Sequence, residues 1–122
     1  MKYTFTKPTV IFRSFDEKMT KEFYIDFLGF TLDWEHRFEP GTPLYMQVSL
    51  GDCLLHISEH FGDSAPGGHI RIMTNDVASY CSDLNQKKYR NARPGFQDQS
   101  WGTRDMTIND PSGNRITFYC PL

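Results

Sequence analysis

The stretch that decides the fold is "YMQVSLGDCLLHIS", residues 45–58, read together with "DMTINDPSGNRITFYC", residues 105–120. Each segment alternates apolar and polar side chains on both sides of a short glycine-containing turn, which is the pattern of a β-hairpin. The two segments can be laid over each other with two extra residues in the second turn. A pattern that recurs after about half of a chain indicates a duplicated supersecondary unit.

The segments before each hairpin extend this duplication. "TVIFRSF" at 9–15 predicts a strand, a helix follows from Asp16 to Gly29 with Met19, Phe23 and Phe27 on its apolar stripe, and residues 30–38 alternate again. In the second half the pattern predicts a strand at 69–73, a helix capped by Asn75 or Asp76 that carries Val77, Tyr80, Cys81 and Leu84, and a short strand at 90–96. Lys87 and Lys88 suit the negative end of that second helix.

The element order is therefore β-α-β-β-β, twice. We predict an α+β fold in one domain, residues 1–122, built from two tandem βαβββ modules at about 5–62 and 66–122. The Gly/Pro-rich segment "GDSAPGG" at 62–68 would connect them. A chain of 122 residues is long enough for one hydrophobic core and too short for two independent ones.

Composition and charge narrow the classes of partner. The net charge is −2, so no basic footprint argues for nucleic acid or for an anionic membrane surface. Three cysteines without a C-x-x-C pair, and an N-terminus without a signal-type apolar run, predict a protein of the reducing cytoplasm with no membrane segment. Between Thr31 and Asp63, six acidic residues stand against Arg37 alone, and this acidic zone is either a site for a cationic partner or a solvated face.

The sequence His56-x-x-Glu59-His60 has the spacing of a zinc-protease signature, which requires a helix. Here the segment follows a hairpin turn and alternates as a strand does. On a strand the two histidines would stand about 13 Å apart, too far to share one metal ion. We therefore expect no protease site, while His56 itself lies on the strand face that the helix does not cover.

The doubled unit, with "FYIDFLGFTLDWE" in its first half and "DPSGNRITF" in its second, resembles the glyoxalase/bleomycin resistance/extradiol dioxygenase superfamily, also called vicinal oxygen chelate. The resemblance covers nearly the whole chain, and "QSWGTRDMTINDPSGNRITF" is most similar to the bleomycin resistance protein branch. The resemblance implies curved half-barrel sheets with the helices outside and a ligand cavity on the concave face. It also implies a homodimer with ligand grooves between the subunits.

Enzymes of this superfamily hold a divalent metal with one residue from each of four equivalent strand positions. Carried onto this chain, these positions fall on Thr9, His69 and Thr117, and on either Leu55 or His56 in the first hairpin. The apolar pattern favours His56. Threonine cannot replace a carboxylate, so we expect no resident metal cofactor, and His56 and His69 alone would form only a weak divalent site.

Strand alternation supplies the candidate ligand-binding residues. Tyr45 and Gln47 oppose the apolar Met46 and Val48, whereas Trp34, His36 and Phe38 share a face that is either cavity or core. The full candidate set is Trp34, His36, Phe38, Tyr45, Gln47, His56, His69, Arg71 and Trp101. No catalytic residue is identified, because no nucleophile elbow, Ser-His-Asp set or phosphate loop is present.

Two functions fit these residues. The resemblance implies a protein that sequesters a bleomycin-type glycopeptide antibiotic, or a similar cationic aromatic ligand, without chemistry. Aromatic rings would stack on the drug, and Glu35, Glu39 and Glu59 would attract its positive charge. The alternative is a metal-dependent lyase, isomerase or dioxygenase of the same superfamily.

Overall fold

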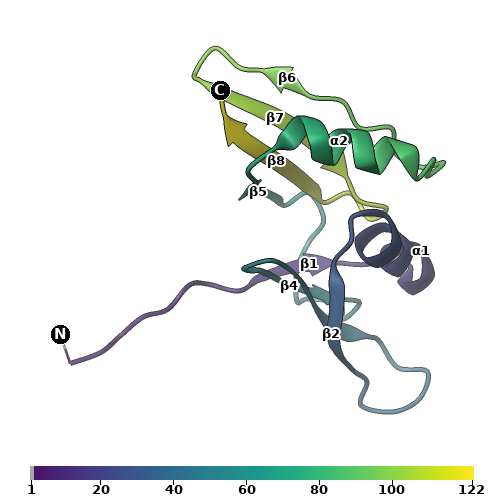
Figure 1. Cartoon of the computed structure of the whole chain (residues 1–122). Coiled ribbons are helices and arrows are strands. Elements are labelled where there is room, and N and C mark those ends of the chain that lie inside the picture. Colours follow the sequence, from purple (N-terminus) through teal and green to yellow (C-terminus); the bar gives the residue numbers. More distant parts are fainter. Residues whose placement is uncertain (1) are drawn as a thin grey trace.

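The computed structural model describes residues 2–122. The chain folds into two four-stranded sheets, and helical segments pack beside each of them (Figure 1). Module one contains β1 (Val10–Arg13), α1 (Glu17–Lys21), the π-helix η1 (Glu22–Phe27), β2 (Thr31–His36), β3 (Tyr45–Leu50) and β4 (Cys53–Ser58). Module two contains β5 (His69–Met73), α2 (Val77–Gln86), β6 (Gln97–Asp98), β7 (Thr103–Asn109) and β8 (Arg115–Pro121). Among these described residues, no helix has the length and apolar character needed to cross a bilayer.

Strand pairing is the same in both modules. The strand orders are β1-β4-β3-β2 and β5-β8-β7-β6, with the first pair of each sheet parallel and the hairpin strands antiparallel. This confirms the predicted α+β fold of two βαβββ modules. The short strand expected at 90–96 is misplaced, because β6 comprises only Gln97 and Asp98. Pro94 and Gly95 interrupt the earlier segment, since proline lacks the N–H that a strand ladder needs.

Both helices begin at an aspartate that caps them. Asp16 Oδ1 accepts a hydrogen bond of 3.0 Å from the backbone N–H of Met19, and Asp76 Oδ1 accepts one of 3.0 Å from that of Ser79. Such N-caps satisfy backbone donors that have no partner within the helix. The sequence offered Asn75 or Asp76 as the cap of the second helix, and the structure shows that it is Asp76. The first helix ends before Gly29, whose φ of +92° is available to glycine at little cost.

The first helix widens after its first turn, because Glu22–Phe27 is a π-helix. Its wider turn places four large side chains toward the core: Phe23, Tyr24, Phe27 and Leu28, none of which is more than 2% exposed. The predicted apolar stripe is therefore wrong at its start, since Met19 is 38% exposed and Thr20 is buried in its place. The Thr20 hydroxyl is hydrogen bonded to Ser14 at 2.7 Å, which explains how a polar residue is accommodated there.

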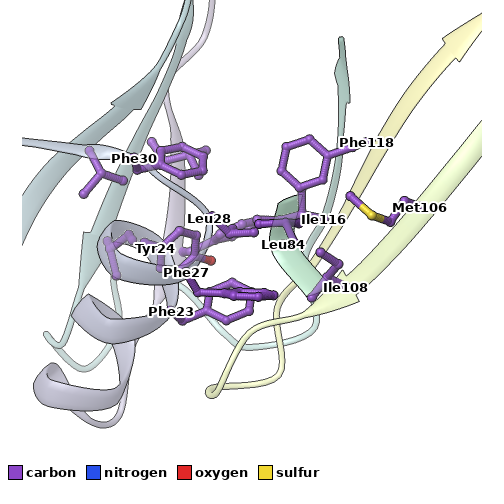
Figure 2. Packing of buried hydrophobic residues seen from close by; sticks show 14 of the residues in the cluster. Phe23, Tyr24, Phe27, Leu28, Phe30, Leu84, Met106, Ile108, Ile116 and Phe118 are labelled. Atoms are coloured by element: carbon purple, nitrogen blue, oxygen red, sulfur yellow. The ribbon is translucent and has the colours of Figure 1, made fainter. Parts of the chain in front are cut away.

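One hydrophobic cluster runs through both modules (Figure 2). Rings from the first helix, among them Phe23 and Phe27, extend toward Leu84 of α2 and toward Ile108 and Ile116 of the second sheet. Burying an aliphatic or aromatic side chain of this size contributes about 1.5–3 kcal/mol. The two modules consequently share one core instead of forming one each.

Polar contacts reinforce this shared core. The Tyr80 hydroxyl donates to the carbonyl of Leu28 at 2.7 Å, and Lys87 Nζ donates to the carbonyls of Asp26 and Phe27 at 3.0 and 2.7 Å. The sequence suggested that Lys87 complements the C-terminal end of its own helix. Its side chain instead binds the C-terminal end of the first helix. A cation at this end complements the negative end of the helix dipole.

Residues 2–9 extend away from the rest of the molecule as an arm (Figure 1). They form no helix or strand, and the side chains of Tyr3 and Phe5 are 70% and 80% exposed.

Candidate functional site

The candidate site lies on the face of the first sheet that the helices leave open. Leu55 and Ile57 are at most 2% exposed and turn toward the core, so the intervening His56 turns the other way. Ile11 and Gln47 are the register partners of His56 on the two neighbouring strands. We call this surface the module-one face; it comprises Ile11, Arg13, Trp34, His36, Tyr45, Gln47, Leu54, His56 and Ser58. Of the two positions considered for the first hairpin, His56 and not Leu55 belongs to it.

Three rings meet at the centre of the module-one face. Trp34 and Tyr45 are stacked, with ring centroids 6.0 Å apart and planes at 10°. His56 meets both rings edge-on, at 5.3 Å from Trp34 and 5.2 Å from Tyr45. Trp34 thus lies on the same side as His56, and 43% of it remains exposed. Of the two possibilities left open by the sequence, Trp34 lies on the open face of the sheet and not on the face that packs against the core.

A chain of hydrogen bonds links these rings to β2. His56 Nε2 is 3.0 Å from Gln47 Oε1, so in the neutral ring this nitrogen carries the proton, and the Tyr45 hydroxyl donates to His56 Nδ1 at 2.7 Å. Gln47 Nε2 then donates to Asp33 at 3.1 Å, and Ser49 donates to the same carboxylate at 3.0 Å. Partial burial, with the nearby charge of Asp63 as a second cause, raises the pKa of the Tyr45 hydroxyl. Both nitrogens of His56 are therefore already engaged.

Asp33 is the member of this chain that the sequence did not identify. Strict alternation would place it opposite Trp34, but the register of β2 against β3 shifts between Leu32 and Trp34. Such an irregularity lets two residues of one strand face the same side. A β-bulge has no reliable signature in a single sequence, so the contact of Asp33 with Gln47 could not be foreseen.

A second aromatic group lies where β2 ends. The ring of Phe38 meets His36 edge-on at 5.0 Å and His60 at 5.8 Å, and Phe38 is 76% exposed. The segment from Cys53 to Ser58 is a strand, as predicted, and His60 lies beyond its end. The helical geometry that a zinc protease requires is absent from this segment.

On the equivalent face of module two, His69 and Arg71 have fixed partners. His69 Nε2 is 2.7 Å from the Thr117 hydroxyl, and Arg71 donates to both carboxylate oxygens of Asp105 at 3.0 and 3.3 Å. The guanidinium of Arg71 also lies 4.3 Å from the ring centroid of Tyr119. The hydrogen bonds from Arg71 hold the pKa of Asp105 below its usual value. This face is therefore polar and preorganised, but its aromatic content is low.

The four positions that would hold a metal do not form a fitting donor set. His56 belongs to the first sheet and His69 to the second, while Thr9 precedes β1 and Thr117 is hydrogen bonded within module two. Within residues 2–122 there is no group of three or more His, Cys, Asp or Glu side chains arranged to hold a metal ion. A catalytic divalent ion normally needs at least three such ligands.

Two other residues that the sequence analysis assigned to ligand binding, Trp101 and Glu35, do not belong to the module-one face. Trp101 lies in the turn between β6 and β7 and is 67% exposed, and its part in a site stays a prediction. Glu35 turns away from Trp34 and pairs with Lys21 at 2.8 Å, so the expectation that it offers a free negative charge is wrong.

A cleft of about 940 Å³ lies elsewhere, between the turn joining β3 to β4, strand β5 and the start of α2. Of the predicted site residues, only Arg71 lines it. None of the rings of Trp34, Tyr45 and His56 lines this cleft, so the aromatic cluster and the cleft lie in different places.

Comparison with known proteins agrees with this fold. The family model described as "Glyoxalase superfamily protein" matches residues 2–121. No curated protein matches the chain.

Solved structures resemble the chain over nearly its full length. An antibiotic binding protein from Streptomyces sp. CB03234, TnmS3, is 23% identical with a TM-score of 0.73, covering 98% of this chain and 100% of its own. A glyoxalase/bleomycin resistance protein from the same organism is 24% identical with a TM-score of 0.70, covering 92% and 97%. A bleomycin-binding protein complexed with bleomycin is 22% identical with a TM-score of 0.67, covering 97% and 100%. At these identities the likeness concerns the fold.

Proposed function

Since the chain belongs to the glyoxalase superfamily, we propose that it is a small-molecule binding protein that holds a flat aromatic ligand of the bleomycin type on the module-one face, without chemistry. The observation that carries this proposal is the stacked pair Trp34 and Tyr45 with His56 edge-on to both.

Three rings on one open surface offer a platform for a planar heteroaromatic group. Aromatic pairs contribute about 0.5–1.5 kcal/mol beyond the area that they bury. Trp34 keeps 43% of its surface exposed, so part of the indole is free to contact a ligand. Phe38 and His36 extend the aromatic surface toward the end of β2. A ligand with two linked flat rings would match this extended shape.

The polar groups of the face favour binding over catalysis. A general base needs a free nitrogen within hydrogen-bond reach of its substrate. In His56, one ring nitrogen is hydrogen bonded to Tyr45 and the other to Gln47. These bonds fix the ring as a wall of the site. Two proteins of similar structure, an antibiotic binding protein and a bleomycin-binding protein, support the same class of ligand.

Fluorescence can test the proposal because the chain has only two tryptophans. In the Trp101→Phe variant, Trp34 is the sole reporter, and we expect bleomycin to quench it saturably at micromolar concentration. The complementary Trp34→Phe variant, which leaves Trp101, shows whether that residue also senses the drug. A parallel titration of free N-acetyltryptophanamide corrects for light absorbed by the drug.

Calorimetry supplies the matched comparison. Trp34→Ala should weaken bleomycin binding at least tenfold, whereas Phe96→Ala, which removes a partly exposed ring from module two, should leave binding unchanged. Absence of heat and of quenching at tens of micromolar drug would exclude bleomycin sequestration. A thermal-shift screen of other aromatic antibiotics then tests the wider ligand class, because a ligand of the folded state raises the melting temperature.

A further inference from the structure

Arg13 lies on the module-one face without a partner. Its register partner on β4 is Ser58, one row from the pair Ile11 and His56, so its side chain projects to the same side as His56. The side chain is half-buried, and within residues 2–122 it forms neither a hydrogen bond nor an ion pair. Its Nη1 atom is inaccessible to solvent and has no acceptor.

Three other arginines on or beside the two sheets are paired. Arg37 binds Glu17, Arg71 binds Asp105 at 3.0 Å, and Arg104 binds Asp98 at 2.7 Å. A buried guanidinium nitrogen without an acceptor raises the free energy of the folded chain, and such groups are rare enough to call for an explanation. Arg13, Arg37 and Arg104 are the half-buried arginines of residues 2–122, and of these three only Arg13 has no hydrogen-bonded or ionic partner.

The position of Arg13 is well defined. The backbone N–H of Ser14 donates to the carbonyl of Ser58 at 2.8 Å, and Asn114 Nδ2 donates to the carbonyl of Arg13 at 2.8 Å. The guanidinium lies 4.9 Å from the ring centroid of Phe15, a distance at which cation–π attraction operates. Its lack of a partner therefore does not reflect a side chain that is free to wander in solvent.

The same row of the sheet leads from Arg13 to the aromatic platform. Ser58 is the register partner of both Arg13 and Tyr45, so the three residues stand side by side across β1, β4 and β3. Two strand spacings separate the Cα atoms of Arg13 and Tyr45 by about 10 Å. The carboxylate of Asp63 accepts a hydrogen bond from Ser58 at 2.6 Å, and no ion pair joins Asp63 to Arg13 within residues 2–122.

We propose that Arg13 binds a carboxylate, or an equivalent anionic oxygen group, on the ligand whose ring stacks on Trp34 and Tyr45. This inference rests on the proposed function and specifies a ligand that shares the flat rings of bleomycin but, unlike that cationic drug, carries an anionic group at one end. The Nε–Nη2 edge of a guanidinium presents two parallel N–H donors that match a carboxylate, and in Arg13 only Nη1 is closed to solvent.

Two probes that differ only in charge test this inference. Quinoline-2-carboxylate and quinoline-2-carboxamide have the same fused ring, and calorimetry measures the affinity of each. On the native protein the carboxylate should bind at least fivefold more tightly than the carboxamide. Arg13→Gln should abolish this preference, and Arg13→Lys, which keeps the charge but not the fork, should retain only part of it. Arg90→Gln, an exposed arginine of module two, is the matched control and should retain all of it.

A measurement on the native chain guards against a variant that fails to fold. In ¹⁵N NMR spectra, the Arg13 Nε–H signal should move on addition of the carboxylate and stay in place with the carboxamide. Equal affinities with an unmoved Arg13 signal would overturn the inference while leaving an aromatic site. Failure of both probes to bind at millimolar concentration would overturn it as well, and the bleomycin titration then judges the proposed function separately.

Discussion

The hydroxyl of Tyr24 donates a hydrogen bond of 2.7 Å to the carboxylate of Asp110, joining the first helix to the turn after β7. The same carboxylate accepts from the backbone N–H groups of Ser112 and Asn114 at 2.8 and 2.9 Å, and so organises the "DPSGN" turn. Burial, together with the charge of Asp110, raises the pKa of Tyr24 well above its usual value, which keeps the hydroxyl protonated as a donor. One side chain thus connects the packing of module one to the hairpin of module two.

Removing this hydroxyl should destabilise the whole chain. We expect Tyr24→Phe to lower the free energy of unfolding by about 1–3 kcal/mol, because Asp110 then loses a buried donor. Urea denaturation followed by circular dichroism measures the change. Tyr3→Phe is the control, since Tyr3 is 70% exposed, and it should alter stability by less than about 0.5 kcal/mol. Equal stabilities of the two variants would contradict the structural role of the bond.

The shared core should make the two modules unfold together. Leu84→Ala removes a side chain that is 1% exposed and should cost about 2–5 kcal/mol. Because Leu84 contacts a cluster drawn from both modules, tryptophan fluorescence and far-UV circular dichroism should report the same single transition in the native chain and in the variant. Two separate transitions would show that the modules are independent units.

Acid should weaken the pair of Arg71 and Asp105. The pKa of Asp105 is lowered in the folded chain, so the stability that it contributes is complete above its unfolded pKa and is lost as the pH falls through the folded value. The difference in melting temperature between the native protein and Asp105→Asn should therefore be constant near neutral pH and shrink below about pH 4. A difference that persists unchanged at pH 2 would assign the effect of the substitution to packing.

The open faces predict a dimer in solution. Trp34 on module one and Met73 on module two, 43% and 59% exposed, lie on sheet faces that the chain itself leaves uncovered. Apolar surface of this kind is normally covered in a functional assembly. Light scattering after gel filtration should give a mass twice that of the 14.2 kDa chain, whereas a clean monomer at micromolar concentration would argue against a groove shared between subunits.

Chelation should have no effect on this protein. Elemental analysis after purification without chelator or added ions should find far less than one metal ion per chain, and EDTA should leave the melting temperature unchanged. A tightly held ion that is lost in His69→Ala would favour the enzyme alternative, since it would require ligands beyond the two histidines.

The sequence was most informative where alternation was regular. The limits of β5, His69–Met73, agree with the prediction to the residue, and β4, Cys53–Ser58, ends where the predicted hairpin segment 45–58 ends, because strand period and burial coincide there. It was least informative where local geometry departs from an ideal period. The π-helix, which exposes Met19, and the β-bulge beside Asp33 arise from tertiary packing, and neither has a signature in residue spacing.

The candidate site was predictable in part for the same reason. Period-two alternation sufficed to place His56 on the open face. It could not predict the hydrogen-bond partners of the two ring nitrogens, which are Tyr45 and Gln47 of the neighbouring strand. Charge counting failed at Glu35, because its salt bridge with Lys21 links residues 14 positions apart.

The π-helix of module one also sets the two halves of this duplicated chain apart. Glu22–Phe27 delivers bulky rings to the centre, while α2 contributes the slimmer Val77, Cys81 and Leu84 in a regular helix. The large side chains of the first helix fill the space that the smaller side chains of α2 leave. The two halves are therefore complementary and are not interchangeable. Exchange of one helix for a copy of the other would crowd or empty the middle of the molecule, which makes the asymmetry a record of divergence after duplication.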